Sequence, residues 1–128
     1  MHIEHVALYV KDLEGAKAFF LKHFRVKVSA LYHNDRTGFS SYFLAFEDSG
    51  TRLELMNRPD MVLREMSDRD VGFVHLAIAL GSRNRVDELT EELVKDGCRL
   101  LSGPRVTGDG YYESCLACFE GNIIELTV

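Results

Sequence analysis

Two histidines and two glutamates lie at matching positions in two similar parts of the chain, and together they could bind a metal. His5 and His75 lie in the similar segments IEHVALYV and FVHLAIAL, and Glu54 and Glu125 each end the pattern G-x-x-x-E. Imidazole nitrogens and carboxylate oxygens suit a divalent transition metal such as Zn, Ni, Co, Mn or Fe better than Mg or Ca. In an octahedral shell, four such ligands would leave two positions for water or substrate.

The spacing of these residues indicates that one structural module occurs twice. Positions 5 and 75 differ by 70 residues, and positions 54 and 125 differ by 71, so a single insertion separates the two copies. Each copy predicts the order β-α-β-β-β. We therefore expect one α+β domain, residues 1–128, with modules at 1–57 and 72–128. The linker at 58–71 has room for a short helix around Met61 to Met66.

Each module has one amphipathic helix pattern. In the first, Asp12 is a candidate N-cap; in the second, Ser82 is the candidate N-cap and Gly97 suits the C-terminal end. The apolar faces expected for the two helices are Leu13, Ala16, Phe20 and Phe24, and then Val86, Leu89, Leu93 and Val94. Strands are expected at 26–32, 39–46, 52–56, 99–101, 111–119 and 123–128, with turns at Gly103-Pro104 and at 108–110.

Side-chain alternation along the strands places the four polar residues away from the helices. Successive side chains of a strand point to opposite faces of the sheet. The aliphatic neighbours of His5, Glu54, His75 and Glu125 are needed for packing against the helices. The four polar side chains therefore lie on the opposite face, where a carboxylate among apolar neighbours is costly to desolvate unless a positive group compensates it.

Composition and charge exclude several classes of protein. The 128 residues are 46% apolar and 27% charged, which is ordinary for a globular domain and excludes a disordered or collagen-like chain. The net charge is -5 with no block of like charge, so we expect no nucleic-acid partner and no anionic membrane surface. The longest apolar run is too short to span a bilayer, and the first residues lack the features of a signal peptide. We therefore expect a cytoplasmic protein.

The three cysteines predict reduced thiols. Cys115 and Cys118 form a C-x-x-C pattern, which is also found in redox and zinc sites. In a strand, however, residues three apart point to opposite faces, and a second pair that could complete a zinc site is missing from the sequence. We expect small, buried core residues here.

The chain resembles the vicinal-oxygen-chelate superfamily, which includes glyoxalase I, methylmalonyl-CoA epimerase, fosfomycin-resistance thiol transferases, extradiol dioxygenases and bleomycin-binding proteins. The segments IEHVALYVKDLEGAKAFF, TRLELM, GFVHLAIAL and EGNIIELTV carry this resemblance. It implies two βαβββ modules that form a cupped, incomplete mixed barrel with the helices outside. It also implies that His5, Glu54, His75 and Glu125 are the metal ligands, as in bacterial-type glyoxalase I.

The resemblance further implies a lyase or isomerase of glyoxalase I type. Such an enzyme moves a proton between adjacent carbons of a small α-oxo or vicinal-oxygen substrate through a metal-bound enediolate. Glu125 is the candidate base, and Glu54 is its counterpart in the other module. Tyr9 and Arg58 replace the arginine and asparagine that commonly contact glutathione in the family, so the use of glutathione stays open.

Four further residues are candidates for lining a substrate pocket: Tyr9, Arg52, Met56 and Phe43. Arg52 could bind an anionic substrate or pair with an acidic residue of the protein. The alternative functions are an epimerase, a dioxygenase, a thiol transferase, or a non-catalytic protein that binds a small molecule or an antibiotic. The family resemblance also predicts a homodimer.

Overall fold

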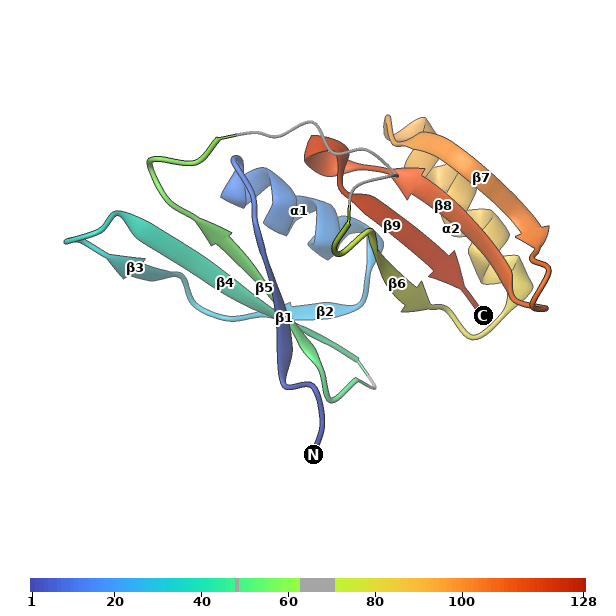
Figure 1. Cartoon of the computed structure of the whole chain (residues 1–128), viewed down its shortest axis with the longest axis horizontal. Coiled ribbons are helices and arrows are strands. Elements are labelled where there is room, and N and C mark those ends of the chain that lie inside the picture. Colours follow the sequence, from blue (N-terminus) through green and yellow to red (C-terminus); the bar gives the residue numbers. More distant parts are fainter. Residues whose placement is uncertain (48, 63–70) are drawn as a thin grey trace. The chain divides into compact units, whose positions relative to one another are not determined.

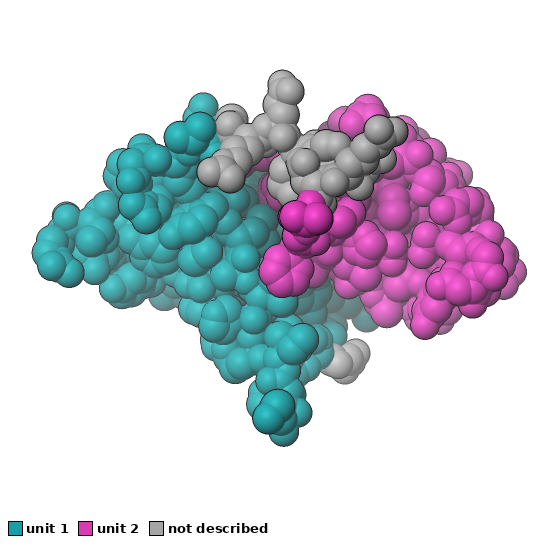
Figure 2. Space-filling model, in the orientation of Figure 1, with its two compact units in different colours: residues 1–64 teal, residues 65–128 magenta. Residues whose placement is uncertain are grey.

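The computed structural model describes residues 1–47, 49–62 and 71–128, which divide into two compact units, residues 1–64 and 65–128 (Figures 1 and 2). The first unit consists of β1 (His5–Tyr9), α1 (Leu13–His23), β2 (Val26–Val28), β3 (Tyr32–Asn34), β4 (Phe39–Phe46) and β5 (Arg52–Asn57). The second consists of β6 (His75–Ala79), α2 (Arg83–Lys95), β7 (Arg99–Val106), β8 (Tyr112–Ala117), a short 3-10 helix (Phe119–Gly121) and β9 (Ile123–Thr127). Most of the short helix expected around Met61 to Met66 lies outside the described residues.

Each unit has one mixed sheet, and the two sheets share a topology. The strand order is β1-β5-β4-β2 in the first unit, where β3 also pairs with β4, and β6-β9-β8-β7 in the second. The first strand of each unit runs parallel to the last, and the remaining pairs are antiparallel. Within the described residues neither sheet closes on itself. The predicted α+β fold of two tandem modules is confirmed.

The predicted helix ends are confirmed by their hydrogen bonds. Asp12 Oδ1 accepts a bond from the Gly15 N–H (2.9 Å), and Ser82 Oγ accepts one from the Arg85 N–H (3.3 Å). These side chains satisfy amide groups that have no partner within the first turn of a helix. Gly97, with φ +97°, ends the second helix in the left-handed region that glycine adopts without strain.

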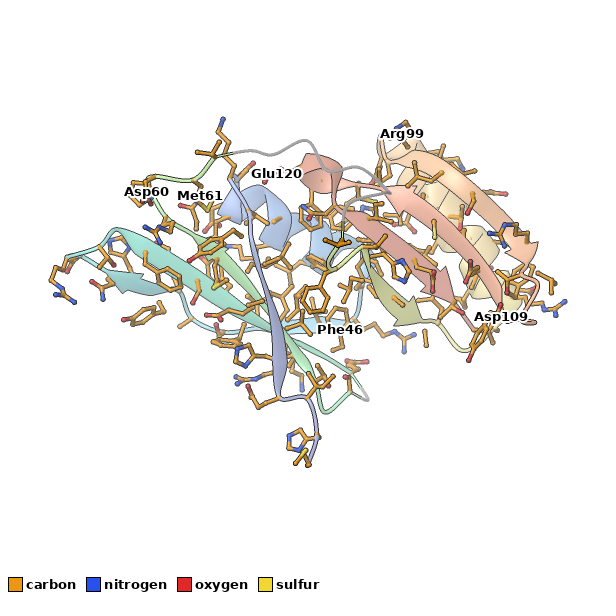
Figure 3. The ribbon with its side chains drawn as sticks, in the orientation of Figure 1. Phe46, Asp60, Met61, Arg99, Asp109 and Glu120 are labelled. Atoms are coloured by element: carbon orange, nitrogen blue, oxygen red, sulfur yellow. The ribbon has the colours of Figure 1, made fainter. Side chains whose placement is uncertain are left out.

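The apolar core of the first unit lies between α1 and its sheet. Phe20 is fully buried, and its ring lies 6.2 Å from the ring of Phe46 (labelled in Figure 3) in an edge-to-face contact. Leu53 and Leu55 of β5 are buried on the same side of the sheet. This arrangement follows from the alternation of β5, whose polar residues point the other way.

The second unit has an equivalent core with one departure from the expected helix face. Val86, Leu89 and Leu93 are buried as predicted. Val94 was expected on that face but is 43% exposed, and Thr90 is buried instead. The Thr90 hydroxyl donates to the Val86 carbonyl and shares a 2.6 Å hydrogen bond with Ser114, which lets a polar residue occupy the core.

Two strand predictions need correction. The expected strand at 26–32 is split into β2 and β3, because the Ser29 hydroxyl accepts the Phe43 N–H (3.0 Å) and interrupts the regular ladder. The turn expected at Gly103-Pro104 lies inside β7, with a shift in register between Ser102 and Arg105. Gly103 has φ +83°, and a Cβ there would approach the Glu113 carbonyl to 2.3 Å, so its lack of a side chain permits a bulge in place of a turn.

Among the described residues, no helix is both long enough and apolar enough to cross a membrane.

Candidate metal centre

Within each unit, the predicted histidine and glutamate lie close together on the sheet face opposite the helix. In β1 and β5, Ala7 pairs with Glu54, and in β6 and β9, Ala77 pairs with Glu125. His5 lies two residues before Ala7, and His75 lies two residues before Ala77, so each histidine is on the same sheet face as the glutamate of the neighbouring strand. The equal registers of the two units produce two equivalent histidine–glutamate pairs.

The distances within the pairs suit ligands of a common metal ion. His5 Nε2 lies 3.8 Å from Glu54 Oε2, and His75 Nε2 lies 3.5 Å from Glu125 Oε2. Two ligand atoms that are each about 2.1 Å from a metal are about 3.0 Å apart at adjacent octahedral positions and about 3.4 Å apart at tetrahedral positions. A small side-chain adjustment would bring either pair to such a spacing, and the donor types fit a divalent transition metal.

The glutamates are the less exposed members of both pairs. The side chains of Glu54 and Glu125 are 14% and 16% exposed, whereas those of His5 and His75 are 40% and 39% exposed. A carboxylate that is partly removed from water is stabilised by a nearby cation. Each unit thus offers a half-buried anionic oxygen beside an imidazole nitrogen that remains reachable from outside.

Glu4 orients the first histidine. The His5 Nδ1–H donates to Glu4 Oε2 at 2.5 Å, and Arg52 also donates to the Glu4 carboxylate. The hydrogen bond from His5, together with that from Arg52, lowers the pKa of the Glu4 carboxyl, so this group is ionised and can only accept. With Nδ1 engaged by Glu4, Nε2 is the ring nitrogen that faces Glu54, 3.8 Å from its Oε2, and is the atom of His5 that could bind a metal.

Sequence reasoning missed Glu4. Alternation along a regular strand would point adjacent residues to opposite faces, but β1 begins only at His5. Glu4 precedes the ladder, so its side chain can turn back toward its neighbour. A carboxylate next to a candidate histidine ligand was the available signal.

Two of the four predicted pocket residues, Arg52 and Phe43, lie next to His5. The guanidinium carbon of Arg52 lies 4.2 Å from the centre of the Phe43 ring, and the Phe43 ring meets His5 edge-to-face at 5.4 Å. Of the two roles considered for Arg52, the structure contains the pairing with an acid, Glu4. Phe43 lies opposite Glu54 in the register of β4 and β5.

The other two predicted pocket residues, Tyr9 and Met56, lie opposite one another at the far end of β1 and β5. Tyr9 also hydrogen-bonds Arg58, whose guanidinium makes a bidentate ion pair with Asp60 (2.6 and 2.7 Å; Asp60 is labelled in Figure 3). The hydrogen bonds that Arg58 donates to Asp60 are the largest cause of a raised pKa of Arg58, and the hydrogen bond with Tyr9 raises it further. The two residues that depart from the glutathione-contact pattern therefore contact each other.

Around Glu125 the structure places residues that the sequence interpretation did not assign to a site. Cys115 pairs with Glu125 in the register of β8 and β9, and its Sγ lies 3.7 Å from Glu125 Oε2. One ligand atom each from Glu113, Cys115 and Glu125 lie within 4.8 Å of one another. Burial, and then the charge of Glu125, raise the pKa of the Cys115 thiol.

The expectation that Cys115 is a core residue is wrong. It is half-buried and lies on the polar face with Glu125, because Leu116 takes the core-facing position of that strand. Cys118 instead hydrogen-bonds Cys98, and burial raises the pKa of both of these thiols. The two cysteines of the C-x-x-C pattern do have different surroundings, as alternation predicts.

Comparison with known proteins identifies the family. The family model "Glyoxalase/Bleomycin resistance protein/Dioxygenase superfamily" matches residues 2–126. The uncharacterized protein YqjT of Bacillus subtilis (strain 168) is 32% identical over 117 residues, which cover 86% of this chain and 85% of that protein.

Solved structures with a similar fold include a glyoxalase I and a fosfomycin resistance protein. Glyoxalase I of Leishmania major, described as trypanothione-dependent, has a TM-score of 0.78 at 20% identity, covering 99% of this chain and 86% of that one. A point mutant of the fosfomycin resistance protein FosX of Listeria monocytogenes, in complex with Mn(II) and 1S,2S-dihydroxypropylphosphonic acid, has a TM-score of 0.75 at 23% identity, covering 98% and 90%. With a family model that spans nearly the whole chain and a repeated module that accounts for the fold, this protein belongs to the glyoxalase/bleomycin resistance protein/dioxygenase superfamily.

Proposed function

We propose that this protein is a metal-dependent lyase or isomerase of glyoxalase I type, acting on a small α-oxo or vicinal-oxygen substrate. The observation that carries the proposal is the repeated histidine–glutamate pair, at 3.8 Å in one unit and 3.5 Å in the other. A binding protein that only sequesters an apolar ligand would have no need for two half-buried carboxylates beside imidazoles.

His5, Glu54, His75 and Glu125 are the residues that would hold the metal. A bound divalent metal would supply a Lewis acid that polarises the substrate oxygens and stabilises negative charge on them. The hydrogen bond between Nδ1 of His5 and Glu4 orients the His5 ring, so that Nε2 is the nitrogen that would bind the metal. The remaining chemistry, the movement of a proton between two adjacent carbons, requires a base from the protein.

Glu125 is the proposed base, with Glu54 as its counterpart in the other unit. The side chain of Glu125 is 16% exposed, and its Oε2 lies 3.5 Å from His75 Nε2, so a carboxylate oxygen is available on the proposed metal-binding face. A Glu125 carboxylate oxygen that is not engaged by the metal would take the proton from one carbon and return it to the neighbouring carbon. Phe43 and Arg52 would line the substrate space beside the first pair, and Tyr9 and Met56 its other end.

The substrate class is supported by what the relatives bind. The Listeria FosX structure contains a compound with hydroxyl groups on adjacent carbons, together with Mn(II). The Leishmania relative is a glyoxalase I described as trypanothione-dependent. In this chain Tyr9 and Arg58 bond each other, which favours a small substrate or a thiol other than glutathione.

The test combines metal analysis with an activity assay. Protein purified without chelator should contain about one divalent metal ion per set of four ligands, and it should isomerise methylglyoxal in the presence of one of several thiols. Glu125→Gln should keep most of its metal and lose activity, whereas Glu125→Ala and His75→Ala should lose both. A wild-type protein that takes up no divalent metal contradicts the proposal.

The same preparation separates the alternatives. Oxygen consumption would assign a dioxygenase, and thiol-dependent loss of an epoxide would assign a thiol transferase. Ligand binding that survives replacement of both histidines would favour a non-catalytic binding protein. We also propose a homodimer, for which the molar mass measured by light scattering should be twice that of the 14.5 kDa chain.

A further inference from the structure

Two cysteines of the second unit lie opposite one another at one end of the β7–β8 pair. Arg99 pairs with Ala117 in the antiparallel register of these strands. Cys98 comes directly before the first of these residues and Cys118 directly after the second, so the same register brings the two thiols face to face. The hydrogen bond between their side chains shows that they are in contact.

The backbone around the two cysteines has the spacing of a cross-strand disulfide. The Cys98 N–H donates to the Leu93 carbonyl in the last turn of α2, and the Cys118 N–H donates to the Asn122 carbonyl, both at 2.9 Å. The two cysteines therefore do not donate to each other's backbone. At such positions of an antiparallel pair, opposed Cα atoms are about 4.5 Å apart. Disulfides join Cα atoms that are about 4.4–6.8 Å apart, so a bond between these sulfurs fits the backbone as it stands.

The third cysteine of the chain, Cys115, has a different place in the sheet. It pairs with Ser102 of β7 and with Glu125 of β9, and it lies on the polar face with that glutamate. Cys118 follows three residues later, so alternation places it on the opposite face, which packs against the helix. The second unit thus has one opposed pair of thiols and one separate thiol.

The hydrogen bond between the paired thiols makes them chemically unequal. Burial raises the pKa of both, and the hydrogen bond raises the pKa of Cys118 further while it lowers that of Cys98. Cys118 is therefore the donor and Cys98 the acceptor, because an accepted hydrogen bond stabilises a thiolate. Since the thiolate is the nucleophile in disulfide exchange, Cys98 is the thiol that attacks first.

We propose that Cys98 and Cys118 are a modification site that forms a reversible intramolecular disulfide by exchange with a small-molecule disulfide such as oxidised glutathione. The Cys98 thiolate attacks one sulfur of the small disulfide, which breaks that S–S bond, releases one small thiol and leaves a mixed disulfide on Cys98. Cys118 then attacks the Cys98 sulfur, and the second small thiol leaves. The protons lost by the two cysteines are taken up by the two leaving thiolates, so the protein is oxidised and the small disulfide is reduced.

The bond would join the start of β7 to the end of β8 on the helix face of the sheet. Glu125 and Cys115 lie on the other face. The inference therefore does not depend on the proposed metal centre.

Equilibration with glutathione tests the proposal. The full-length wild type is incubated without denaturant, under argon at pH 8, in mixtures of oxidised and reduced glutathione until its composition is constant. Its remaining thiols are then blocked with iodoacetamide. Mass spectrometry should show a protein that has lost two hydrogen atoms and carries one blocked thiol. Trypsin should then release residues 96–99 joined to residues 106–128.

Variants assign the bond, because residues 106–128 contain both Cys115 and Cys118. Cys115→Ser is the matched control and should form the joined peptides to the same extent as the wild type. Cys98→Ser and Cys118→Ser should each lose the joined peptides completely. Their remaining thiols should carry at most a mixed disulfide with glutathione, which excess reduced glutathione removes.

The stability of the oxidised protein gives an independent readout. Oxidised wild type should unfold at a higher urea concentration than reduced wild type, because the bond restricts the unfolded chain. The same oxidising mixture should not raise the urea midpoint of Cys98→Ser.

Four results would overturn the inference. They are a wild type that keeps all three thiols free in the most oxidising mixture, joined peptides that persist in Cys118→Ser, a bond that forms only in urea, and an oxidised protein no more stable than the reduced one. None of these results concerns metal binding, so the proposed function would stand. Failure of the wild type to take up a divalent metal would contradict the proposed function and leave this inference intact.

Discussion

Replacing Glu4 by alanine should weaken divalent-metal binding although Glu4 is not itself a proposed ligand. In the structure its carboxylate accepts the proton-bearing Nδ1 of His5 at 2.5 Å and also pairs with Arg52. This contact selects the tautomer whose Nε2 is free and fixes the orientation of the ring. Without it, the His5 ring must lose its rotational freedom each time it binds the metal.

The size of the effect follows from the exposure of the two groups. Loss of a carboxylate that orients a histidine ligand typically costs about 10- to 100-fold in metal affinity. The Glu4 and His5 side chains are 54% and 40% exposed, so water can replace part of the lost contact and salt screens the rest. We therefore expect the lower end, about tenfold at low ionic strength, and a smaller difference at high salt.

The assay is a competition titration of Zn²⁺ against a chromophoric chelator, at neutral pH and at two salt concentrations. Glu14→Ala is the matched control, because Glu14 is also an exposed glutamate of the first unit but bonds Lys17 and Tyr42, away from His5. Glu4→Gln, which keeps a neutral acceptor, should fall between the wild type and Glu4→Ala. Equal zinc affinities for Glu4→Ala and Glu14→Ala would refute the reasoning.

Three further predictions concern stability. Thr90→Val leaves the buried Ser114 hydroxyl without its 2.6 Å partner and should lower the free energy of unfolding by about 1–3 kcal/mol, while the double variant with Ser114→Ala should recover part of the loss; urea unfolding measures both. Leu126→Ala removes a fully buried side chain and should cost about 2–5 kcal/mol, measured in the same way against wild type. The hydrogen bond from Lys17 is the main cause that lowers the pKa of Glu14. The wild type should therefore be more stable than Glu14→Gln above pH 4.5, and this difference should disappear as the pH falls through the lowered pKa of Glu14. Thermal unfolding of both proteins between pH 3 and 7 checks this prediction.

These outcomes can each fail in an informative way. An unchanged stability of Thr90→Val would mean that water or another group satisfies Ser114. A small loss in Leu126→Ala would mean that the core of the second unit collapses around the cavity. A Glu14→Gln difference that persists at pH 3 would assign the effect to packing and not to charge.

Local patterns predicted most of the elements because they depend on neighbours in the chain. The caps at Asp12 and Ser82 were predictable, since a capping side chain bonds an amide three residues away. Alternation correctly separated Leu53 and Leu55 from Glu54, since the period of a strand is a local property. The same reasoning failed at Gly103, where the choice between a turn and a bulge depends on the close approach of another strand at Glu113.

The neighbours of the candidate ligands could not be predicted in this way. That Cys115 lies beside Glu125 depends on the register between β8 and β9, and a shift of one residue would have turned the thiol to the core. That Glu4 bonds His5 depends on where β1 begins. Both are decided by pairing across the sheet, which no single segment specifies.

By itself, the sequence determined that one βαβββ module occurs twice and that each copy presents a histidine and a glutamate on the face opposite its helix, because repetition and side-chain periodicity are written along the chain. Only the tertiary structure decided the spacing of the histidine and glutamate in each pair, the partner that orients His5 and the thiol that adjoins Glu125. Those contacts join residues of separate strands or depend on where a strand begins, so they are set by hydrogen-bond register and packing.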